Sequence, residues 1–269
     1  MNARYFVDYH THTEFSPDSD AEMLTVCEQA ARLGLSRLAI TDHVEISAFY
    51  QNGYDKTSAL SFEKAGEMQR LFKGRLDVIR GIELGQPTHD LDTAERLLKE
   101  YDFDFVLGAL HNLKVEKDFY YYDFESVDVR SVMDRYFAEM LEIVRWGRFH
   151  SLAHLTYPFR YIPRDKYPED YSFWRDEIDE ILRLLASKGI ALEINTSGLR
   201  QQIGKLMPDL AIIKRFRELG GEMVTVGSDA HKAEDVGKNI LDGIRAAAGA
   251  GFGHIAAFKG GKAEMIPIP

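Results

Sequence analysis

Histidines and carboxylates recur in this sequence directly after short apolar segments. The first group is His10-Thr11-His12, which follows the apolar run Tyr5-Phe6-Val7 and precedes Asp18 by six residues. Alternate side chains of a strand share a face, so His10 and His12 are expected to point the same way and to bind one metal ion. The other candidate ligands at the ends of apolar segments are His43, Glu83, His111, His154, Asp229 and His231.

The donor set indicates which metals could bind. Imidazoles and carboxylates without thiolates suit zinc, manganese or ferrous iron. Nine ligands are more than one or two ions of ordinary coordination number need, and a carboxylate such as Glu83 can bridge two ions. The set therefore predicts a centre of two or three divalent ions. Such a centre lowers the pKa of a bound water from about 15.7 to about 7 and can bind a phosphoryl group.

Other polar residues near these motifs are assigned different roles. His89 and His254 lack a comparable context and are interpreted as surface or structural residues. His150 competes with His154, but it stands at the amino end of its apolar segment, so His154 is favoured as the ligand. Asp42 is expected to orient an imidazole or to cap a loop rather than to bind metal.

Two arginines follow predicted strands and could bind an anion. Arg160 lies shortly after His154, and Arg200 ends the segment Asn195-Thr196-Ser197-Gly198-Leu199-Arg200. A guanidinium group pairs with phosphate oxygens through two parallel donors. Either arginine could instead be a surface salt-bridge partner, but their positions on adjacent loops favour phosphate binding. Lys205 is a weaker candidate.

The elements that must position these residues repeat one pattern, in which a short apolar strand, a polar loop and an amphipathic helix follow each other. This alternation predicts parallel βαβ units. Strands are expected at residues 5–10, 37–41, 77–83, 105–110, 150–154, 190–195 and 223–227, and helices at 19–34, 61–73, 91–100, 127–146, 172–187, 209–219 and 236–248. An open sheet would bring together only the strands that flank its switch point, whereas a closed barrel delivers every carboxyl end to one rim. Because polar residues end six of the seven predicted strands, we expect a seven-stranded α/β barrel that forms a single domain over residues 1–269.

Composition limits the class of partner. The chain has 269 residues and a net charge of −10, which disfavours nucleic-acid polymers but allows a small phosphorylated substrate in a local cationic pocket. We expect no membrane span, because no apolar run reaches about 18 residues, and a cytoplasmic location, because no secretion signal is evident and an internal disulfide is impossible with a single cysteine. That cysteine, Cys27, fits the apolar face of a helix. The sequence does not indicate an oligomeric state.

Taken together, the motifs resemble the polymerase and histidinol phosphatase (PHP) superfamily. The resemblance is carried by His10-Thr11-His12, Thr41-Asp42-His43, Gly81-Ile82-Glu83, Leu110-His111, His154 and Ser228-Asp229-Ala230-His231. It implies a distorted (β/α)7 barrel with three metals. One would be held by His10, His12, Glu83 and Asp229, a second by Glu83, His111 and His154, and a third by Asp18, His43 and His231. Some relatives carry histidine at the position of Asp18.

Within the superfamily, the segments around Arg160 and Arg200 resemble the stand-alone histidinol-phosphatase branch, in which both arginines would bind the phosphate of histidinol phosphate. Candidates for recognition of the substrate amine are Glu14, Glu45 or an acid in the loop 116–125, without preference among them. The tyrosines at 120–122 could pack in the core or form a lid over the rim.

The resulting hypothesis is hydrolysis of a phosphomonoester in histidine biosynthesis. A hydroxide that bridges two metals would attack phosphorus, with Asp229 as the base for the water and Arg160 as a phosphate ligand. The third metal, with His43 and His231, would stabilise the leaving oxygen. The alternatives are a PHP phosphoesterase that acts on nucleotides or other small esters, and a non-catalytic metal-binding domain.

Overall fold

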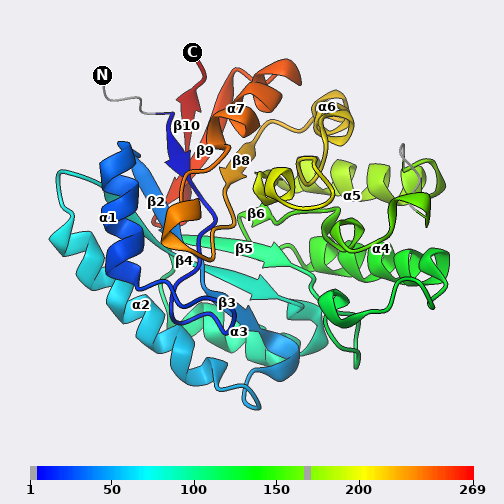
Figure 1. Cartoon of the computed structure of the whole chain (residues 1–269), viewed down its shortest axis with the longest axis horizontal. Coiled ribbons are helices and arrows are strands. Elements are labelled where there is room, and N and C mark those ends of the chain that lie inside the picture. Colours follow the sequence, from blue (N-terminus) through cyan, green and yellow to red (C-terminus); the bar gives the residue numbers. More distant parts are fainter. Residues whose placement is uncertain (1–4, 167–170) are drawn as a thin grey trace.

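Parallel strands form the centre of the computed structural model, which describes residues 5–166 and 171–269 (Figure 1). The strands are β1 (Val7–Asp8), β2 (Arg37–Ile40), β3 (His43–Glu45), β4 (Asp77–Gly85), β5 (Phe105–Ala109), β6 (Ser151–Leu152), β7 (Ala191–Asn195) and β8 (Val224–Gly227). Their order in the sheet is β1-β2-β4-β5-β6-β7-β8, and β3 pairs with β4 beyond the end of β2. Because β2 and β3 pair with successive parts of β4, the sheet has seven strand positions.

Backbone hydrogen bonds between the first and last strands nearly close the sheet into a barrel. Tyr9 N donates to Val226 O over 3.0 Å, and beyond the regular strands Asp229 N donates to His10 O over 2.8 Å and His12 N to Ala230 O over 2.9 Å. This arrangement confirms the predicted (β/α)7 barrel. Every strand therefore delivers its carboxyl end to the same rim.

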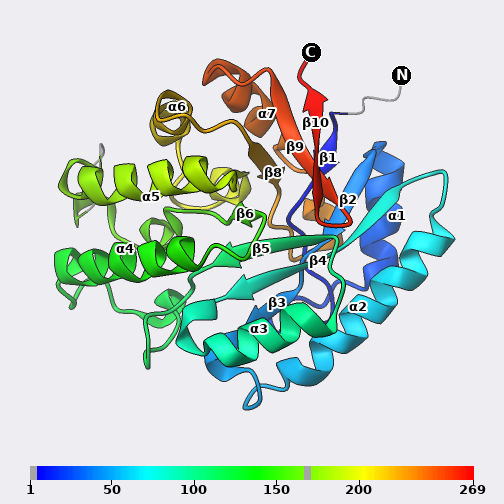
Figure 2. The ribbon, with the colours of Figure 1, turned by 180° about the vertical axis from the view of Figure 1, so that it is seen from behind.

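Helices surround the barrel and bury one apolar stripe each against it (Figures 1 and 2). They are α1 (Met23–Leu33), α2 (Tyr54–Leu71), α3 (Leu91–Glu100), α4 (Val129–Trp146), α5 (Arg175–Lys188), α6 (Leu210–Glu218) and α7 (Ile240–Gly249). Asp90, Asp128 and Asp209 cap the amino ends of α3, α4 and α6 with side-chain hydrogen bonds. Cys27 is buried on α1, as predicted. No helix in the described ranges is long and apolar enough to cross a membrane.

A C-terminal hairpin, β9 (His254–Lys259) and β10 (Lys262–Pro267), lies against the amino end of the barrel. Tyr9 Oη donates to Phe258 O over 2.9 Å, and Gly260 N donates to a carboxylate oxygen of Asp104, just before β5, over 2.8 Å. The His150 ring lies 5.1 Å from the Phe258 ring, and its Nδ1 accepts from Val106 N, so His150 lies at this amino end as predicted. The hairpin leaves the opposite rim as the open end.

Several element boundaries differ from the expected ones. The strands expected at 5–10 and 150–154 are regular only over Val7–Asp8 and Ser151–Leu152. Helix α2 begins at Tyr54 rather than 61, because Gly53 takes a left-handed φ of 76° and starts the helix within the expected loop. The helix expected at 236 begins at Ile240, because Gly237 N donates to the buried Asp8 carboxylate and holds this segment as a turn.

Candidate metal centre

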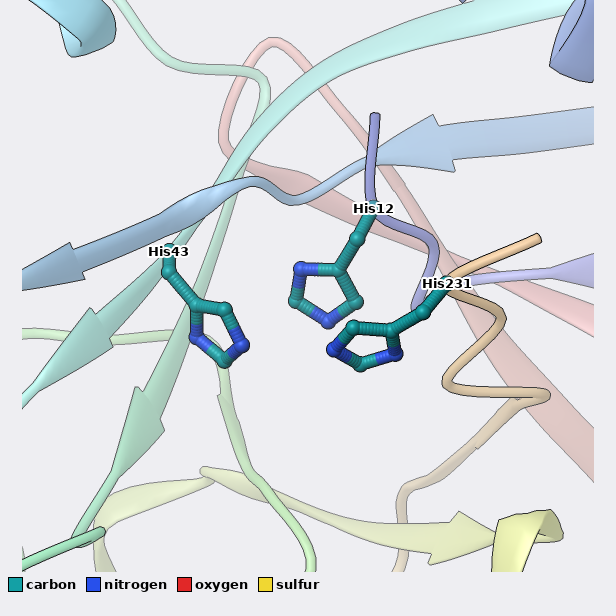
Figure 3. A group of neighbouring side chains, drawn as sticks. All are labelled: His12, His43 and His231. Atoms are coloured by element: carbon teal, nitrogen blue, oxygen red, sulfur yellow. The ribbon is translucent and has the colours of Figure 1, made fainter. Parts of the chain in front are cut away.

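The predicted ligands meet at the carboxyl rim of the barrel. Figure 3 shows three of them, His12, His43 and His231, which come from three separate segments and face one another. Their ring centroids lie 4.2 Å apart for His12 and His43 and 4.1 Å apart for His12 and His231. His10, His12 and Glu83 are completely buried, whereas 56% of the Asp18 side chain is exposed. The cluster thus runs from a dry interior to an open edge.

One group of four side chains has the spacing of a tetrahedral metal site. His10 Nε2 lies 3.3 Å from Glu83 Oε2 and 3.7 Å from Asp229 Oδ1. His12 Nε2 lies 3.6 and 3.4 Å from the same two atoms. Ligands bound tetrahedrally at about 2.1 Å lie about 3.4 Å from one another. These four separations between the histidines and the carboxylates are therefore close to those of ligands that share an ion.

Glu83 turns its second oxygen to two further imidazoles. Oε1 lies 2.7 Å from His154 Nε2 and 3.2 Å from His111 Nε2, and these nitrogens are 3.3 Å apart. Since Oε2 faces His10 and His12, the carboxylate is positioned to bridge two ions. His154 reaches this position with a left-handed φ of 50°, which is costly for a residue other than glycine.

A third group lies at the exposed edge. Asp18 places Oδ2 3.1 Å from His231 Nε2 and Oδ1 3.6 Å from His43 Nε2. His43 Nδ1 also lies 2.8 Å from Glu83 Oε2, so this ring joins the third group to the buried carboxylate. All nine predicted residues are thus brought into three adjoining groups.

Acceptors outside these groups orient the imidazoles. His10 Nδ1 lies 2.7 Å from Glu193 Oε1, and His111 Nδ1 lies 2.8 Å from Glu45 Oε1. His12 Nδ1 lies 3.1 Å from the hydroxyl of Ser16. A proton on each Nδ1 leaves the Nε2 lone pair free for a metal ion. Sequence reasoning missed Glu193 and Ser16, although an acid inside the apolar strand Ala191–Asn195 was a usable signal for Glu193.

Unpartnered buried atoms fit a cluster of divalent ions. His10 Nε2, His12 Nε2, His43 Nδ1 and Glu83 Oε2 are buried and make no hydrogen bond of normal geometry among the described residues, although His43 Nδ1 lies 2.8 Å from Glu83 Oε2. Buried polar atoms are ordinarily satisfied, because leaving them unpaired costs about 1–3 kcal/mol each. Here the unpaired atoms converge on one point, and they are nitrogen and oxygen donors that zinc, manganese and iron accept.

Without metal, protons compensate the charges of the cluster. Burial raises the pKa of Glu83, but the charges of His10, His111 and His43 outweigh it and hold that pKa well below its usual range. Burial lowers the pKa of His111, but Glu45 and Glu83 outweigh it and raise the value to about 10. For His12, burial and the charge of His231 lower the pKa well below its usual range. A divalent ion must therefore displace protons from part of this cluster.

Asp42 does not reach the metal groups. Its carboxylate accepts from Thr13 N, the Thr13 hydroxyl, Ser16 Oγ and Ser61 Oγ, which caps the loop after His12 as predicted. Asp42 also holds the Ser16 hydroxyl, which lies 3.1 Å from His12 Nδ1, so it helps to orient the His12 ring. The histidines interpreted as structural lie elsewhere, because His89 pairs with Glu139 and His254 is exposed on the hairpin.

Both predicted arginines lie beside the centre. Arg160 Nη1 is 3.9 Å from Asp229 Oδ2, and its guanidinium lies 5.1 Å from the rings of both Tyr157 and Tyr161. Arg200 Nη2 donates to Ser228 O, one residue before Asp229, and its Nη1 is buried without a hydrogen-bond partner among the described residues. Lys205 is half-buried on the loop after β7.

The aromatic insertion divides between core and rim. Phe119 is completely buried, whereas Tyr120 and Tyr121 are 65% and 63% exposed. The Tyr120 ring packs edge-on against Tyr161 at 5.9 Å. The insertion therefore packs beside Arg160 through Tyr161, and its role as a lid over the rim stays a prediction.

Comparisons with known proteins agree with this architecture. The PHP domain family matches residues 8–197. A probable histidinol-phosphatase of Thermotoga maritima is 33% identical over 239 residues, which cover 89% of this chain and 90% of the relative. The histidinol-phosphatase of Lactococcus lactis is 29% identical and covers 96% of both chains.

Solved structures give the same result. The crystal structure of histidinol phosphate phosphatase from Lactococcus lactis, complexed with zinc, L-histidinol and phosphate, superposes with a TM-score of 0.82 at 27% identity. It covers 96% of this chain and 98% of that chain. A putative histidinol phosphatase from Listeria monocytogenes shares the fold, with a TM-score of 0.73 at 19% identity over 88% of this chain and 99% of that one.

Proposed function

This chain belongs to the PHP domain family, and we propose that it is a metal-dependent phosphomonoesterase that hydrolyses L-histidinol phosphate. The observation that carries the proposal is the near-full-length similarity to histidinol phosphate phosphatase, whose structure holds zinc, L-histidinol and phosphate. The donor set at the barrel rim of this chain is chemically suited to the same type of ion. The reaction would serve histidine biosynthesis.

The nine rim residues are proposed to hold three divalent ions of zinc, manganese or iron. The first site comprises His10, His12, Glu83 and Asp229, the second Glu83, His111 and His154, and the third Asp18, His43 and His231. The distances within each group, between 2.7 and 3.7 Å, are compatible with this division, and His43 links the groups through its contact with Glu83. When bound, such ions supply Lewis-acid charge and ionise water near neutral pH.

Residues of the chain would bind the phosphate and move the proton. Arg160 and Arg200 Nη1, which is unpartnered in the part of the chain that the structure describes, offer N–H donors to the phosphate oxygens, which neutralises charge as the transition state forms. Asp229 Oδ2 accepts from Ser197 Oγ over 3.0 Å and from Asn195 Nδ2 over 3.3 Å, so its carboxylate is held in one orientation. Asp229 accepts the proton that the attacking water loses. The P–O bond to the alcohol then breaks on the side of His43 and His231. The leaving oxygen takes up a proton and Asp229 releases the one it accepted, so the net products are the alcohol and inorganic phosphate.

Substitution of single ligands tests the centre. His12→Ala or Glu83→Ala should abolish metal content and phosphatase activity together, because each removes a donor from the buried group. Arg160→Ala should raise KM and lower kcat while metal stays bound. His254→Ala, an exposed histidine on the hairpin, is the matched control and should change neither quantity. Normal phosphatase activity in the Glu83 variant would refute the proposed centre.

A substrate panel on metal-replete protein tests the substrate. Histidinol phosphate is compared with nucleotides and sugar phosphates, because the exposed Tyr120 at the rim could stack on a nucleobase instead. A preference for histidinol phosphate below about tenfold, which is about 1.4 kcal/mol in transition-state binding, contradicts the histidinol assignment but not the hydrolase. We further propose that the protein is cytoplasmic and does not act on nucleic-acid polymers, in keeping with its net charge of −10.

A further inference from the structure

Histidinol phosphate carries an ammonium group two carbons from the ester oxygen, and a site for it needs an acidic partner near the phosphate. Most acids around the rim already have other partners. Glu14 is held at the start of α1, where its Oε2 accepts from Met23 N over 2.7 Å. Both oxygens of Glu45 are occupied, Oε1 by His111 and Oε2 by Gln86. Glu45 therefore has no free oxygen for the amine, and Glu14 is tied to the start of α1 instead of to the loops beside Arg160.

The acids of the loop 116–125 divide in the same way. Glu116 pairs with Tyr122 and Arg135. Asp123 accepts from the hydroxyl of Ser126, and Glu125 forms an ion pair with Lys166. The acid that is left in this loop is Asp118, which has no nitrogen of a described lysine, arginine or histidine within 4.0 Å of its carboxylate.

The fold brings Asp118 back to the metal centre. The loop after His111 folds over, so that Asn112 and Asp118 form an isolated antiparallel bridge, and Phe119 N donates to His111 O over 3.0 Å. Asp118 Oδ1 accepts from Tyr120 N over 2.7 Å and from Tyr157 Oη over 3.3 Å. Its Oδ2 has no hydrogen-bond partner among the described residues.

Tyr157 connects this carboxylate to the reacting end of the site. Its ring stacks on His154 at 5.2 Å and lies 5.0 Å from the His111 ring. The Arg160 guanidinium lies over the same ring. The Tyr157 ring is therefore the only side chain between Asp118 and the proposed metal and phosphate ligands in this set of contacts between described residues. We expect the ammonium group, which is bonded to the carbon next to the phosphate-bearing carbon, to reach Asp118 across this distance.

The electrostatic surroundings of Asp118 favour a cationic ligand. The side chain is half-buried, and burial raises the pKa of its carboxyl above the usual value, although the charge of His111 and the hydrogen bonds from Tyr120 and Tyr157 offset part of this rise. A carboxylate that loses hydration without gaining a cation is destabilised. An ammonium group would supply the missing charge and a donor for Oδ2.

We propose that Asp118 is the residue that binds the substrate amine and thereby sets specificity for amino-alcohol phosphates. This assignment rests on the proposed phosphatase function and names the part of the site that recognises the leaving group. Asp118 binds the ammonium through Oδ2, while Tyr157 and the backbone of Tyr120 hold Oδ1. The phosphate end remains with Arg160 and the metal centre.

The test compares Asp118→Asn with the wild type on three esters. Histidinol phosphate has both amine and imidazole, 2-aminopropyl phosphate keeps only the amine, and 3-(imidazol-4-yl)propyl phosphate keeps only the imidazole. The variant should lose at least about tenfold in kcat/KM on the two aminated esters, because a charge-assisted hydrogen bond is removed. It should change by less than about twofold on the amine-free ester.

Binding measurements give a readout that does not depend on turnover. By calorimetry on metal-replete protein, the Kd of L-histidinol should rise about tenfold in the variant, whereas the Kd of inorganic phosphate and the metal content stay unchanged. Asp118→Glu should recover part of the loss. Glu125→Gln, in the same loop but paired with Lys166, is the control and should behave as the wild type.

Equal losses of kcat/KM on all three esters would overturn the proposal, since they indicate a structural role for Asp118. A loss confined to the amine-free ester, or no loss on any ester, would also overturn it. The substrate preference of the wild-type protein tests the proposed function separately. If it prefers another phosphate ester, the histidinol assignment is wrong, and the comparison of aminated with amine-free esters still decides the role of Asp118.

Discussion

Glu193 shows how a residue outside the proposed ligand set can control it. The carboxylate is completely buried, with Oε1 on His10 and Oε2 accepting from Asn195 Nδ2 over 3.1 Å. It therefore fixes the tautomer of His10 and raises the basicity of Nε2. Partners of this kind are worth about 10–100-fold in metal affinity.

Glu193→Gln should lower zinc affinity by about 10–100-fold without unfolding the protein, because an amide keeps the shape but loses the charge. The measurement is a competitive zinc titration, with circular dichroism as the folding control. Glu218→Gln, an exposed pair of Arg215, should leave zinc affinity unchanged. Unchanged affinity in the Glu193 variant would show that this hydrogen bond does not tune His10.

The protonation of His111 makes metal uptake dependent on pH. Because its pKa is raised to about 10 in the metal-free protein, the imidazole carries a proton at neutral pH that must leave when an ion binds. Apparent zinc affinity should therefore increase as pH rises from about 6 to about 8. Calorimetry in buffers of different ionisation enthalpy should show proton release, and uptake of protons on binding would contradict the scheme.

Among the elements, the ends of strands β1 and β8 must lie very close together for His10 to reach its position. A Cβ on Gly227, at the end of β8, would lie 2.3 Å from His10 Cβ and 2.6 Å from Glu193 Oε1. Glycine at this position lets the two strand ends pack together and places His10 against its acceptor. The short regular part of β1 is compensated by the side chain of Asp8, which accepts from Ser228 N over 2.8 Å.

Gly227→Ala should destabilise the fold by about 1–3 kcal/mol and also lower metal content, because the added methyl displaces His10. Gly189→Ala is the matched control, since its φ of 64° carries a strain of about 1–2 kcal/mol but no atom lies within 4 Å of the added Cβ. Denaturant unfolding and metal analysis distinguish the two variants. Full metal content in the Gly227 variant would contradict the steric account.

At the scale of the whole molecule, the barrel joins residues from both ends of the chain. The C-terminal hairpin closes the amino end, and the centre combines residues from His10 to His231. That residues 1–269 form one domain stays a prediction, and it can be tested by the cooperativity of unfolding. Metal binding should stabilise the whole chain rather than one segment.

Calorimetric unfolding should show a single transition that moves upward when zinc is added. At a free zinc concentration of 100 times Kd, linkage gives about 2.7 kcal/mol. For a chain of this length, that corresponds to an increase in Tm of about 5–10 °C. Two transitions, of which zinc shifts only one, would contradict the single domain.

The sequence alone was sufficient for the alternation of strands and helices, the nine candidate ligands and the barrel. The reason is that local patterns report them: apolar segments mark the strands, and the closing histidine or acid marks the rim. Element boundaries were less predictable, as at Tyr54 and Ile240, because they depend on turns and on distant hydrogen bonds such as that between Asp8 and Gly237.

Only the tertiary structure decided which acids remain available. Glu14, Glu45 and Asp118 are equivalent as residue types, and their difference lies in partners that are distant in sequence or held by a folded loop. The same holds for Glu193, whose role depends on a contact with His10 across 183 residues. The sequence determines which residues carry a carboxylate. Whether that carboxylate already has a hydrogen-bond or ion-pair partner depends on the packing of the whole barrel.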